Sequence, residues 1–262
     1  MKKLIFLIFP LFVLMTSCED GVLLFSLEDD KAMGASADLE IESDPNTYPI
    51  LNEASNQQAY AYLNGMKDII LNSGEVKYKD EFVWQLHIID DDAVLNAFCT
   101  PGGYIYVYTG LIKYLDNGSS LAGVMGHEMG HADGRHSSKQ MQEQYGLAAL
   151  LQIITGGDPG TLAQLAANLV NLSFSRKDET NADNRSVRYL CDTNFEADGA
   201  ANFFQKIIDE GNPSPPQFLS THPNPDNRVQ NIEAEAASLS CGAEDPDPTI
   251  NGINYAQFKA LL

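Results

Sequence analysis

Two histidines placed around a glutamate constrain this chain more than any other feature of its sequence. The residues are His127, Glu128 and His131, in the run HEMGH. On an α-helix, a spacing of four puts both imidazoles on the same face, about one turn apart. That spacing suits two ligands of one Zn²⁺, and Glu128 is placed to act on a metal-bound water. A surface helix with two chance histidines is the alternative, but the chain has only 5 histidines and this helix is otherwise apolar.

The helix that carries these residues is predicted to be buried. Ser119 or Ser120 can cap it. Gly126 and Gly130 each cost about 1 kcal/mol of helix propensity relative to alanine, and their spacing puts both on one side of the helix. We therefore expect a neighbouring element to approach closely along these glycines. The apolar positions are Leu121, Val124, Met125, Met129 and Ala132.

A second helix, predicted for residues 178–190, carries two acidic side chains one turn apart. Glu179 and Asp183 share a face of this helix. Acidic pairs on helices are usually solvated, so the pair alone does not indicate a site. Beside a helix with two histidine ligands, it becomes the obvious source of a carboxylate ligand. We expect Glu179 to bind the metal and Asp183 to fix the tautomer of a ligand histidine by accepting its hydrogen bond.

Three strand-like runs precede the histidine helix, at residues 82–89, 96–99 and 104–108. They are rich in aromatic and β-branched residues, which favour extended backbone. The turn 101–103 contains two glycines and permits a tight reversal, so the second and third runs are expected to pair antiparallel. His87, alone in the first run, is expected to be a packed or exposed strand residue rather than a ligand.

The first 17 residues are predicted to be a signal peptide. Lys2 and Lys3 precede an apolar run too short to be a membrane span, which ends directly before Cys18. This ending resembles the lipobox of bacterial lipoproteins, in which the cysteine carries the lipid. An ordinary cleaved signal followed by a chance cysteine is the alternative. Residues 18–47 are acidic and are expected to form a flexible tether before one domain at 48–262.

Charge and cysteine content narrow the functional classes. The formal net charge of −20 argues against nucleic acid as a partner, because phosphate binding needs a basic face. The acidity also has a simpler explanation, which is that it keeps the protein soluble.

Beyond Cys18, the chain has Cys99, Cys191 and Cys241, so an exported protein retains at least one free thiol. A Cys191–Cys241 disulfide is one pairing that an oxidising compartment allows, although spacing alone does not establish it.

Four sequence blocks together resemble the zinc metallopeptidases of peptidase family forty-eight, the HtpX and CAAX prenyl protease type. The soluble, exported BepA-like branch is the most similar. HExxH alone is moderately specific, whereas the four blocks in this order are strongly specific. The blocks are Asn96-Ala97-Phe98 with residues 101–103, residues 126–131 with Arg135-His136, residues 175–177 with 179–183, and Thr221-His222-Pro223 with Arg228.

The resemblance implies a fold and a ligand set. The fold is α+β, mainly α: a gluzincin-like zinc peptidase domain with a small, about three-stranded, mostly antiparallel sheet packed on the HExxH helix. One Zn²⁺ per chain is held by His127, His131 and Glu179, and Glu128 acts as general base and then as general acid. The family often has an acidic residue two positions after the ligand glutamate, where this chain has Asn181.

The resemblance also implies roles for residues outside the ligand set. Asp183 falls on the family's aspartate that supports a ligand. His222 and Arg228 match positions near the active site and are expected to be catalytic; the histidine can approach either the metal or the oxyanion of the tetrahedral intermediate. The edge strand with Asn96, Ala97 and Phe98 is expected to bind substrate by strand addition, through backbone hydrogen bonds.

These features predict a zinc-dependent metalloendopeptidase that cleaves misfolded or unassembled envelope proteins. We expect an exported bacterial lipoprotein of the periplasm or outer membrane, attached to the membrane only through its lipid at Cys18. Protein or peptide substrates and outer-membrane protein assembly factors are the expected partners. One alternative is a chaperone-like lipoprotein that binds outer-membrane proteins and whose peptidase activity is latent because His222 fills the fourth metal position. Another is a zinc hydrolase of envelope glycan amide bonds.

Overall fold

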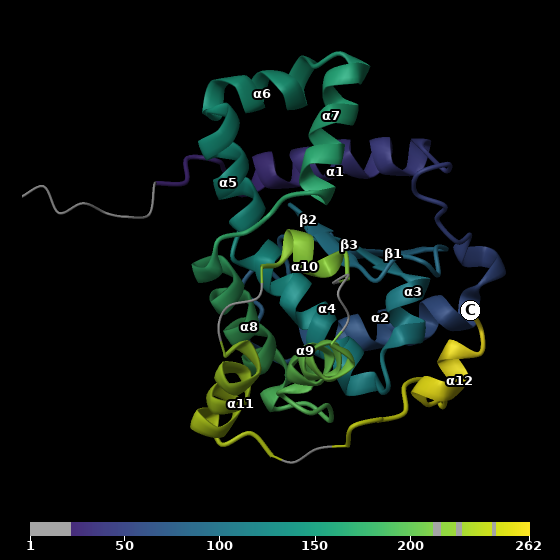
Figure 1. The fold of residues 1–262 in the computed structure, drawn as a ribbon. Coiled ribbons are helices and arrows are strands. Elements are labelled where there is room, and N and C mark those ends of the chain that lie inside the picture. The colour runs from purple at the N-terminus through teal and green to yellow at the C-terminus, as the bar shows by residue number, and fades with distance from the viewer. Residues whose placement is uncertain (1–21, 212–215, 224–226, 243–244) are drawn as a thin grey trace, which may run out of the picture.

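The computed structural model describes residues 22–211, 216–223, 227–242 and 245–262 (Figure 1). The predicted signal peptide and the predicted lipidation site at Cys18 lie outside these residues. Within the described ranges, no helix has both the length and the apolar character needed to cross a membrane. The elements are α1 (Leu27–Ser43), η1 (Glu53–Ser55), α2 (Gln57–Leu71), β1 (Gln85–Ile89), β2 (Ala97–Thr100), β3 (Tyr104–Tyr108), α3 (Thr109–Tyr114), α4 (Gly118–Asp133), α5 (His136–Tyr145), α6 (Leu147–Gly156), α7 (Pro159–Val170), α8 (Arg176–Cys191), α9 (Gly199–Glu210), α10 (Phe218–Thr221), α11 (Arg228–Leu239) and α12 (Tyr255–Lys259).

The sequence prediction of a mainly helical domain with a small three-stranded sheet is confirmed. The strand order is β1-β3-β2. β2 and β3 form the predicted antiparallel hairpin, whereas β1 pairs with β3 in parallel. The chain reverses direction between β1 and β2 and again between β2 and β3, so β3 runs in the same direction as β1. In the sheet, β3 lies between the other two strands. The sheet is therefore mixed rather than mostly antiparallel.

Both faces of the sheet are buried, and each face contributes to a different apolar core. Side chains alternate between the faces along a strand. Ile105 and Val107 of β3 join the core formed with α2, α4, α8 and α9, and Tyr106 joins the core formed with α1 and α7. Figure 1 shows α1 and α7 on one side of the sheet and α2 and α4 on the other. The sheet thus holds α4 against the larger core.

Residues 27–43 do not belong to a flexible tether, as was predicted, but form α1. Ser26 and Asp29 form a capping box at the start of this helix. The prediction was wrong because the acidic composition of this segment conceals a buried stripe at helical spacing. The stripe consists of Met33, Ala37 and Ile41, each no more than 1% exposed.

A buried polar cluster joins α1 to the sheet. Tyr106 donates a hydrogen bond to Asp38 over 2.5 Å, and His87 Nε2 lies 3.0 Å from the same carboxylate oxygen. His87 is thus a packed strand residue, as expected, and it lies outside the histidine cluster on α4. Together with the apolar stripe, these contacts fix α1 against the outer face of the sheet.

Close packing between α4 and α8 depends on the two glycines of the histidine helix. A Cβ atom at Gly126 would lie 2.7 Å from Ser186 Oγ, and one at Gly130 would lie 3.0 Å from the carbonyl oxygen of Ala182. Both neighbours belong to α8. The predicted close approach along the glycines is therefore present, and it brings the acidic face of α8 to the histidines of α4.

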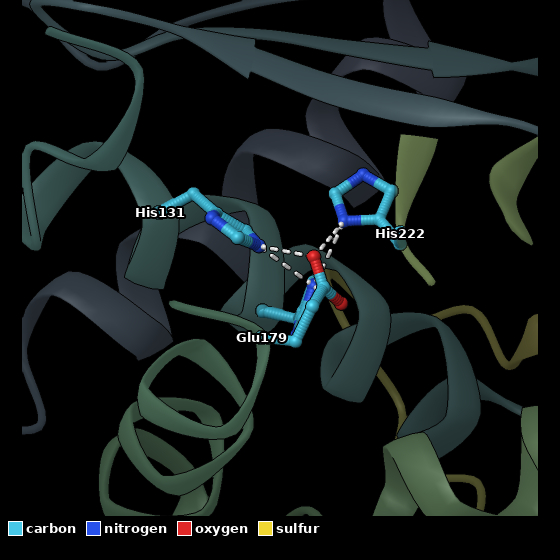
Figure 2. Close-up of side chains that lie close together, drawn as sticks. His131, Glu179 and His222 are labelled. Atoms are coloured by element: carbon cyan, nitrogen blue, oxygen red, sulfur yellow. Dashed lines mark hydrogen bonds and ion pairs between the residues drawn. The ribbon is translucent and has the colours of Figure 1, made fainter. Parts of the chain in front are cut away.

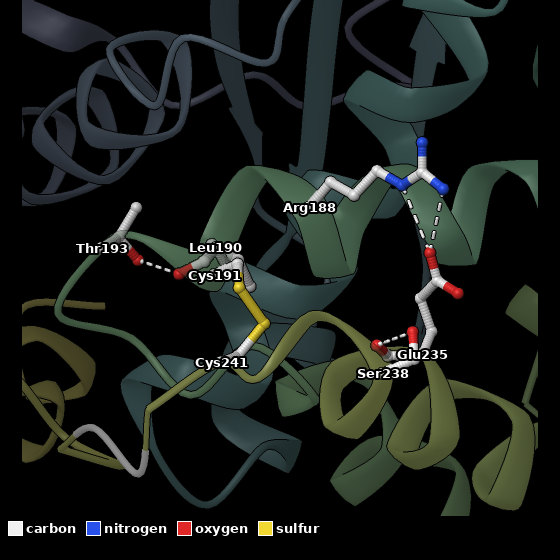
Figure 3. Close-up of a disulfide and its surroundings, with 7 residues drawn as sticks. All are labelled: Arg188, Leu190, Cys191, Thr193, Glu235, Ser238 and Cys241. Carbon is white, nitrogen blue, oxygen red and sulfur yellow. Dashed lines mark hydrogen bonds and ion pairs between the residues drawn. A yellow bond between two sulfur atoms is a disulfide. The ribbon is translucent and has the colours of Figure 1, made fainter.

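A disulfide joins Cys191 at the end of α8 to Cys241, just after α11 (Figure 3). Arg188 and Glu235 form an ion pair of 3.1 Å between the same two helices. The pairing that the sequence left open is thus Cys191–Cys241. Cys99 is free and buried in β2. The covalent link holds α11, and with it Arg228, beside α8.

Candidate metal centre

Four potential metal ligands converge from three parts of the chain. His127 and His131 project from α4, Glu179 from α8, and His222 from the residue that follows α10. One ligand atom from each lies within 4.8 Å of the others. Figure 2 shows His131, Glu179 and His222 pointing toward one another. The structure therefore brings together the three predicted ligands and adds His222 to them.

The spacing of the ligand atoms fits a tetrahedral metal ion. His127 Nε2 lies 3.0 Å from His131 Nε2 and 3.2 Å from His222 Nδ1. Glu179 Oε1 lies 3.4 Å from His131 Nε2 and 3.0 Å from His222 Nδ1. Zinc–ligand bonds of about 2.0–2.1 Å in a tetrahedron place neighbouring ligand atoms about 3.3 Å apart. Three imidazole nitrogens and a carboxylate at these distances are a donor set that zinc accepts.

Asp183 lies where it selects which ring nitrogen of His127 carries the proton. Its Oδ1 lies 2.8 Å from His127 Nδ1, and Arg228 donates to both of its oxygens. Burial by itself raises the pKa of Asp183, but the charge of Arg228 and the hydrogen bond from His127 outweigh burial and hold the pKa below its usual range. The ionised carboxylate accepts the Nδ1–H of His127, so His127 Nε2 presents a lone pair to the ligand set.

The ligand residues are shielded from water. His131 and Glu179 are 0% exposed, and His127 and His222 are 1% exposed. Burial holds the pKa of His131 well below its ordinary value, so the ring is in the neutral form that binds metals.

Two rings that sequence reasoning missed also hold the imidazoles. Phe174 stacks on His131 with ring centroids 3.9 Å apart, and Phe218 stacks on His222 at 4.2 Å. Phe218 lies one helical turn before His222, a spacing that was visible in the sequence. Phe174 carried no comparable signal.

Glu128 lies beside the ligand set without belonging to it. Its Oε1 lies 3.4 Å from His222 Nε2 and has no hydrogen-bond partner among the described residues. Burial raises the pKa of Glu128 to about 8. A carboxyl group that titrates near neutral pH can both accept and return a proton. Glu128 is therefore a buried carboxyl group next to the ligand set.

Arg228 connects both carboxylates of α8. Its guanidinium lies 3.0 Å from Glu179 Oε2 and 2.7 Å from Asp183 Oδ1, and it stacks 3.9 Å over the ring of Phe204. The side chain is 2% exposed. Arg228 thus offsets the negative charge that Glu179 and Asp183 bring into the core.

β2 forms one edge of the sheet next to Glu128. The backbone N–H of Tyr108 donates to the carbonyl of Asn96 over 3.2 Å. Residues alternate in facing the partner strand in antiparallel pairs, so Asn96 and Phe98 turn their backbone groups toward β3. Ala97 and Cys99 turn theirs to the outer edge, which has no strand partner in the described chain.

The three predicted substrate-binding residues, Asn96, Ala97 and Phe98, therefore have different surroundings. Ala97 presents backbone groups at the outer edge, whereas Phe98 stacks on Tyr106 in the opposite core. Asn96 is fully buried, and both polar atoms of its side chain lack a partner in the described structure. Cys99 was not predicted to bind substrate, but its backbone groups point to the same outer edge as those of Ala97. The two-residue period of the strand, counted from Ala97, was the signal that pointed to it.

A helix with HExxH and a glutamate from a second helix define a metal centre of the metallopeptidase class. Comparison with known proteins agrees. The sequence profile of peptidase family M48 matches residues 57–236, more than half of the chain. The chain belongs to peptidase family M48.

Individual relatives are similar over much of the chain. A beta-barrel assembly-enhancing protease of Yersinia pestis is 28% identical over 253 residues, covering 90% of this chain and 49% of the relative. That of Escherichia coli (strain K12) is 29% identical over 210 residues, covering 73% and 41%. The mitochondrial metalloendopeptidase OMA1 of Arabidopsis thaliana is 31% identical over 142 residues, covering 54% and 29%. The chain thus spans about half the length, or less, of these relatives.

Proposed function

We propose that this chain is a zinc-dependent metalloendopeptidase. The observation that carries the proposal is the convergence of buried ligand atoms from His127, His131 and Glu179, with Glu128 lying 3.4 Å from the ring of His222 in the same cluster. A set of histidine and carboxylate donors with tetrahedral spacing favours zinc over magnesium or calcium, which prefer oxygen ligands. Membership of peptidase family M48 supports peptide bonds rather than glycan amides as the target.

The residues of the chain divide the work of peptide hydrolysis. Zinc, when bound, polarises the scissile carbonyl and lowers the pKa of a coordinated water to about 7. Glu128 takes a proton from the attacking water and returns it to the leaving amine. Asp183 keeps His127 in the tautomer whose Nε2 lone pair faces the metal position. Arg228 keeps Asp183 ionised and pairs with Glu179.

Substrate is proposed to bind as an added strand along β2. The outward backbone groups of Ala97 and Cys99 are the hydrogen-bonding partners that an extended peptide needs. The buried amide of Asn96 supports this placement, because a buried polar group without a partner is costly and a substrate peptide group can supply one. Binding through backbone groups depends little on substrate sequence, which suits unfolded proteins.

The active site is proposed to be latent in the conformation described here. His222 contributes Nδ1 to the ligand set, and Glu128 is only 1% exposed, so neither the fourth ligand position nor the base is open to substrate. Access requires α10 and His222 to move away from the segment just before β2, where Phe218 N–H donates to the carbonyl of Leu95. This observation favours a peptidase that is held closed until substrate binds, and it agrees with the latency considered for the chaperone-like alternative.

The cellular setting is proposed from the predicted lipoprotein signal and the named relatives. Two relatives are called beta-barrel assembly-enhancing proteases. We propose that this chain is anchored through a lipid at Cys18 and acts on misfolded or unassembled envelope proteins, close to the outer-membrane assembly factors.

A substrate panel tests the proposed function. Full-length protein and a His222→Ala variant are incubated with unfolded envelope proteins, with casein and with cell-wall fragments, with and without a zinc chelator. Peptide products that disappear with chelator and return with zinc are expected from the protein substrates. Release of amide products from cell-wall fragments alone would contradict the proposal.

A further inference from the structure

Hydrogen bonds behind His131 fix which of its nitrogens carries the proton. These hydrogen bonds run from Arg185 through Asn181 and His136 to His131. The guanidinium of Arg185 donates hydrogen bonds and never accepts them. Arg185 Nε lies 2.8 Å from the side-chain oxygen of Asn181. The Asn181 atom at this position must be an acceptor, so the orientation of the amide follows from the contact with Arg185 alone.

His136 connects Asn181 to the metal ligand. His136 Nε2 lies 3.1 Å from the same Asn181 oxygen, so Nε2 carries a proton, and in the neutral ring Nδ1 presents a lone pair. That Nδ1 lies 3.0 Å from His131 Nδ1, which therefore donates. His131 Nε2 is left unprotonated, and this is the atom 3.4 Å from Glu179 in the ligand set.

We propose that His136 is a positioning residue that, with Asn181 and Arg185, holds His131 in the tautomer and orientation that bind the metal. We call these four residues the His131 relay. The inference rests on the proposed function, which supplies the metal. Residues that orient a metal ligand in this way commonly change metal affinity by about 10- to 100-fold when they are removed.

The local backbone holds His136 in place. Arg135 has a φ of 57°, in the left-handed region, and turns the chain sharply between α4 and α5. His136 thereby folds back beneath the last turn of α4. A Cβ atom at Gly134 would lie 2.5 Å from His136 Nε2, so the ring fills the space that the glycine leaves. Arg135 is itself held by Asp30, over 2.5 Å.

The His131 relay resembles the hydrogen bonds that support His127, and it explains why position 181 is an asparagine. Both ligand histidines of α4 donate their Nδ1–H, and each series of hydrogen bonds ends at an arginine, Arg228 for His127 and Arg185 for His131. Arg185 already has a carboxylate partner in Asp133, over 2.5 Å. At position 181, the His131 relay therefore needs a neutral hydrogen-bond acceptor rather than a further negative charge. The asparagine at the position where the family often has an acidic residue supplies that acceptor.

Variants at His136 separate positioning from packing. In His136→Leu the acceptor for His131 is lost, and we expect the zinc affinity, measured by chelator competition, to fall by about 10- to 100-fold. In His136→Asn the side-chain oxygen replaces Nδ1 as acceptor, so the affinity is expected to stay close to that of the parent. Asn184→Leu, in the same surface hollow as Asn181, is the matched control and is expected to change nothing. Equal affinity in His136→Leu and the parent, or equal loss in both His136 variants, would overturn the relay.

Nitrogen NMR of the metal-free full chain tests the tautomers without relying on metal or turnover. We expect the proton of His136 on Nε2 and that of His131 on Nδ1. The opposite tautomer at either ring would overturn the relay. Parent protein that shows these tautomers but binds no zinc would contradict the proposed function and leave the relay supported, so the two failures are distinguishable.

Discussion

His222 Nδ1 lies 3.0 Å from Glu179 Oε1, within the ligand set, although the two residues are 43 positions apart. Glu179 belongs to a long helix packed on α4, whereas His222 follows the short helix α10. The contact therefore joins a helix of 16 residues to the residue that follows a helix of 4 residues. This relationship makes His222 the most direct candidate for a gate.

Replacing His222 with alanine should increase proteolysis. Loss of the imidazole frees the fourth ligand position and weakens the attachment of α10. A loss of about 1.4 kcal/mol from the closed state changes the closed–open equilibrium tenfold. We expect His222→Ala to cleave casein about tenfold faster than the parent or more. Slower cleavage would instead assign His222 to stabilisation of the oxyanion.

Removing the carboxylate of Glu179 should remove the metal. Glu179→Ala takes away the only carboxylate of the ligand set, so we expect no zinc to remain by elemental analysis after dialysis. Thr180→Ala, at the next and exposed position of α8, serves as control and should keep one zinc per chain. Full zinc occupancy in Glu179→Ala would reject the ligand assignment.

Arg228 should contribute far more to stability than Arg188, although both arginines pair with acids across α8 and α11. Arg228 is buried between two carboxylates, and breaking a buried ion pair costs about 3–5 kcal/mol because a charge is left without a partner. The side chain of Arg188 is 54% exposed, and pairs of this kind contribute about 0–1 kcal/mol. Urea unfolding of Arg228→Met and Arg188→Met, both free of metal, measures the difference. Equal losses would show that the Arg228 cluster is not a buried, paired network.

The disulfide should stabilise the domain through the loop that it closes. Cys191 and Cys241 are separated by 50 residues, and the chain-entropy estimate for such a loop is about 4 kcal/mol. The double Cys→Ser variant should lose about this much free energy of unfolding in denaturant experiments. The parent under reducing conditions should lose a similar amount. Cys99 remains in both proteins, so an unchanged stability would show that the disulfide does not form.

The centre was largely predictable from sequence because its residues are arranged on regular helices. The spacing of His127 and His131 on one helix, and of Glu179 and Asp183 on another, fixes their faces in advance. The glycines at 126 and 130 indicated the side of close approach, and the structure places Ser186 and Ala182 there. Local periodicity was enough for these features.

Other features depend on packing that no local pattern encodes. β3 takes the central place in the sheet and pairs with β1 in parallel, which the hairpin signal alone could not show. The helical stripe of α1 was present at Met33, Ala37 and Ile41, but the acidic composition outweighed it in the prediction. The contact of His136 with His131 depends on the left-handed backbone of Arg135, which the sequence did not indicate.

The central claim is that Glu128 transfers the proton in a zinc-dependent peptidase, and one variant tests it most directly. Glu128→Gln is introduced into the His222→Ala background, and zinc content and casein cleavage are measured on the same purified sample. The glutamine keeps the shape of the side chain but cannot take up a proton. We predict one zinc per chain, as in the His222→Ala parent, and no detectable cleavage. Cleavage at the rate of His222→Ala with zinc bound would contradict the assignment of Glu128 and the mechanism built on it.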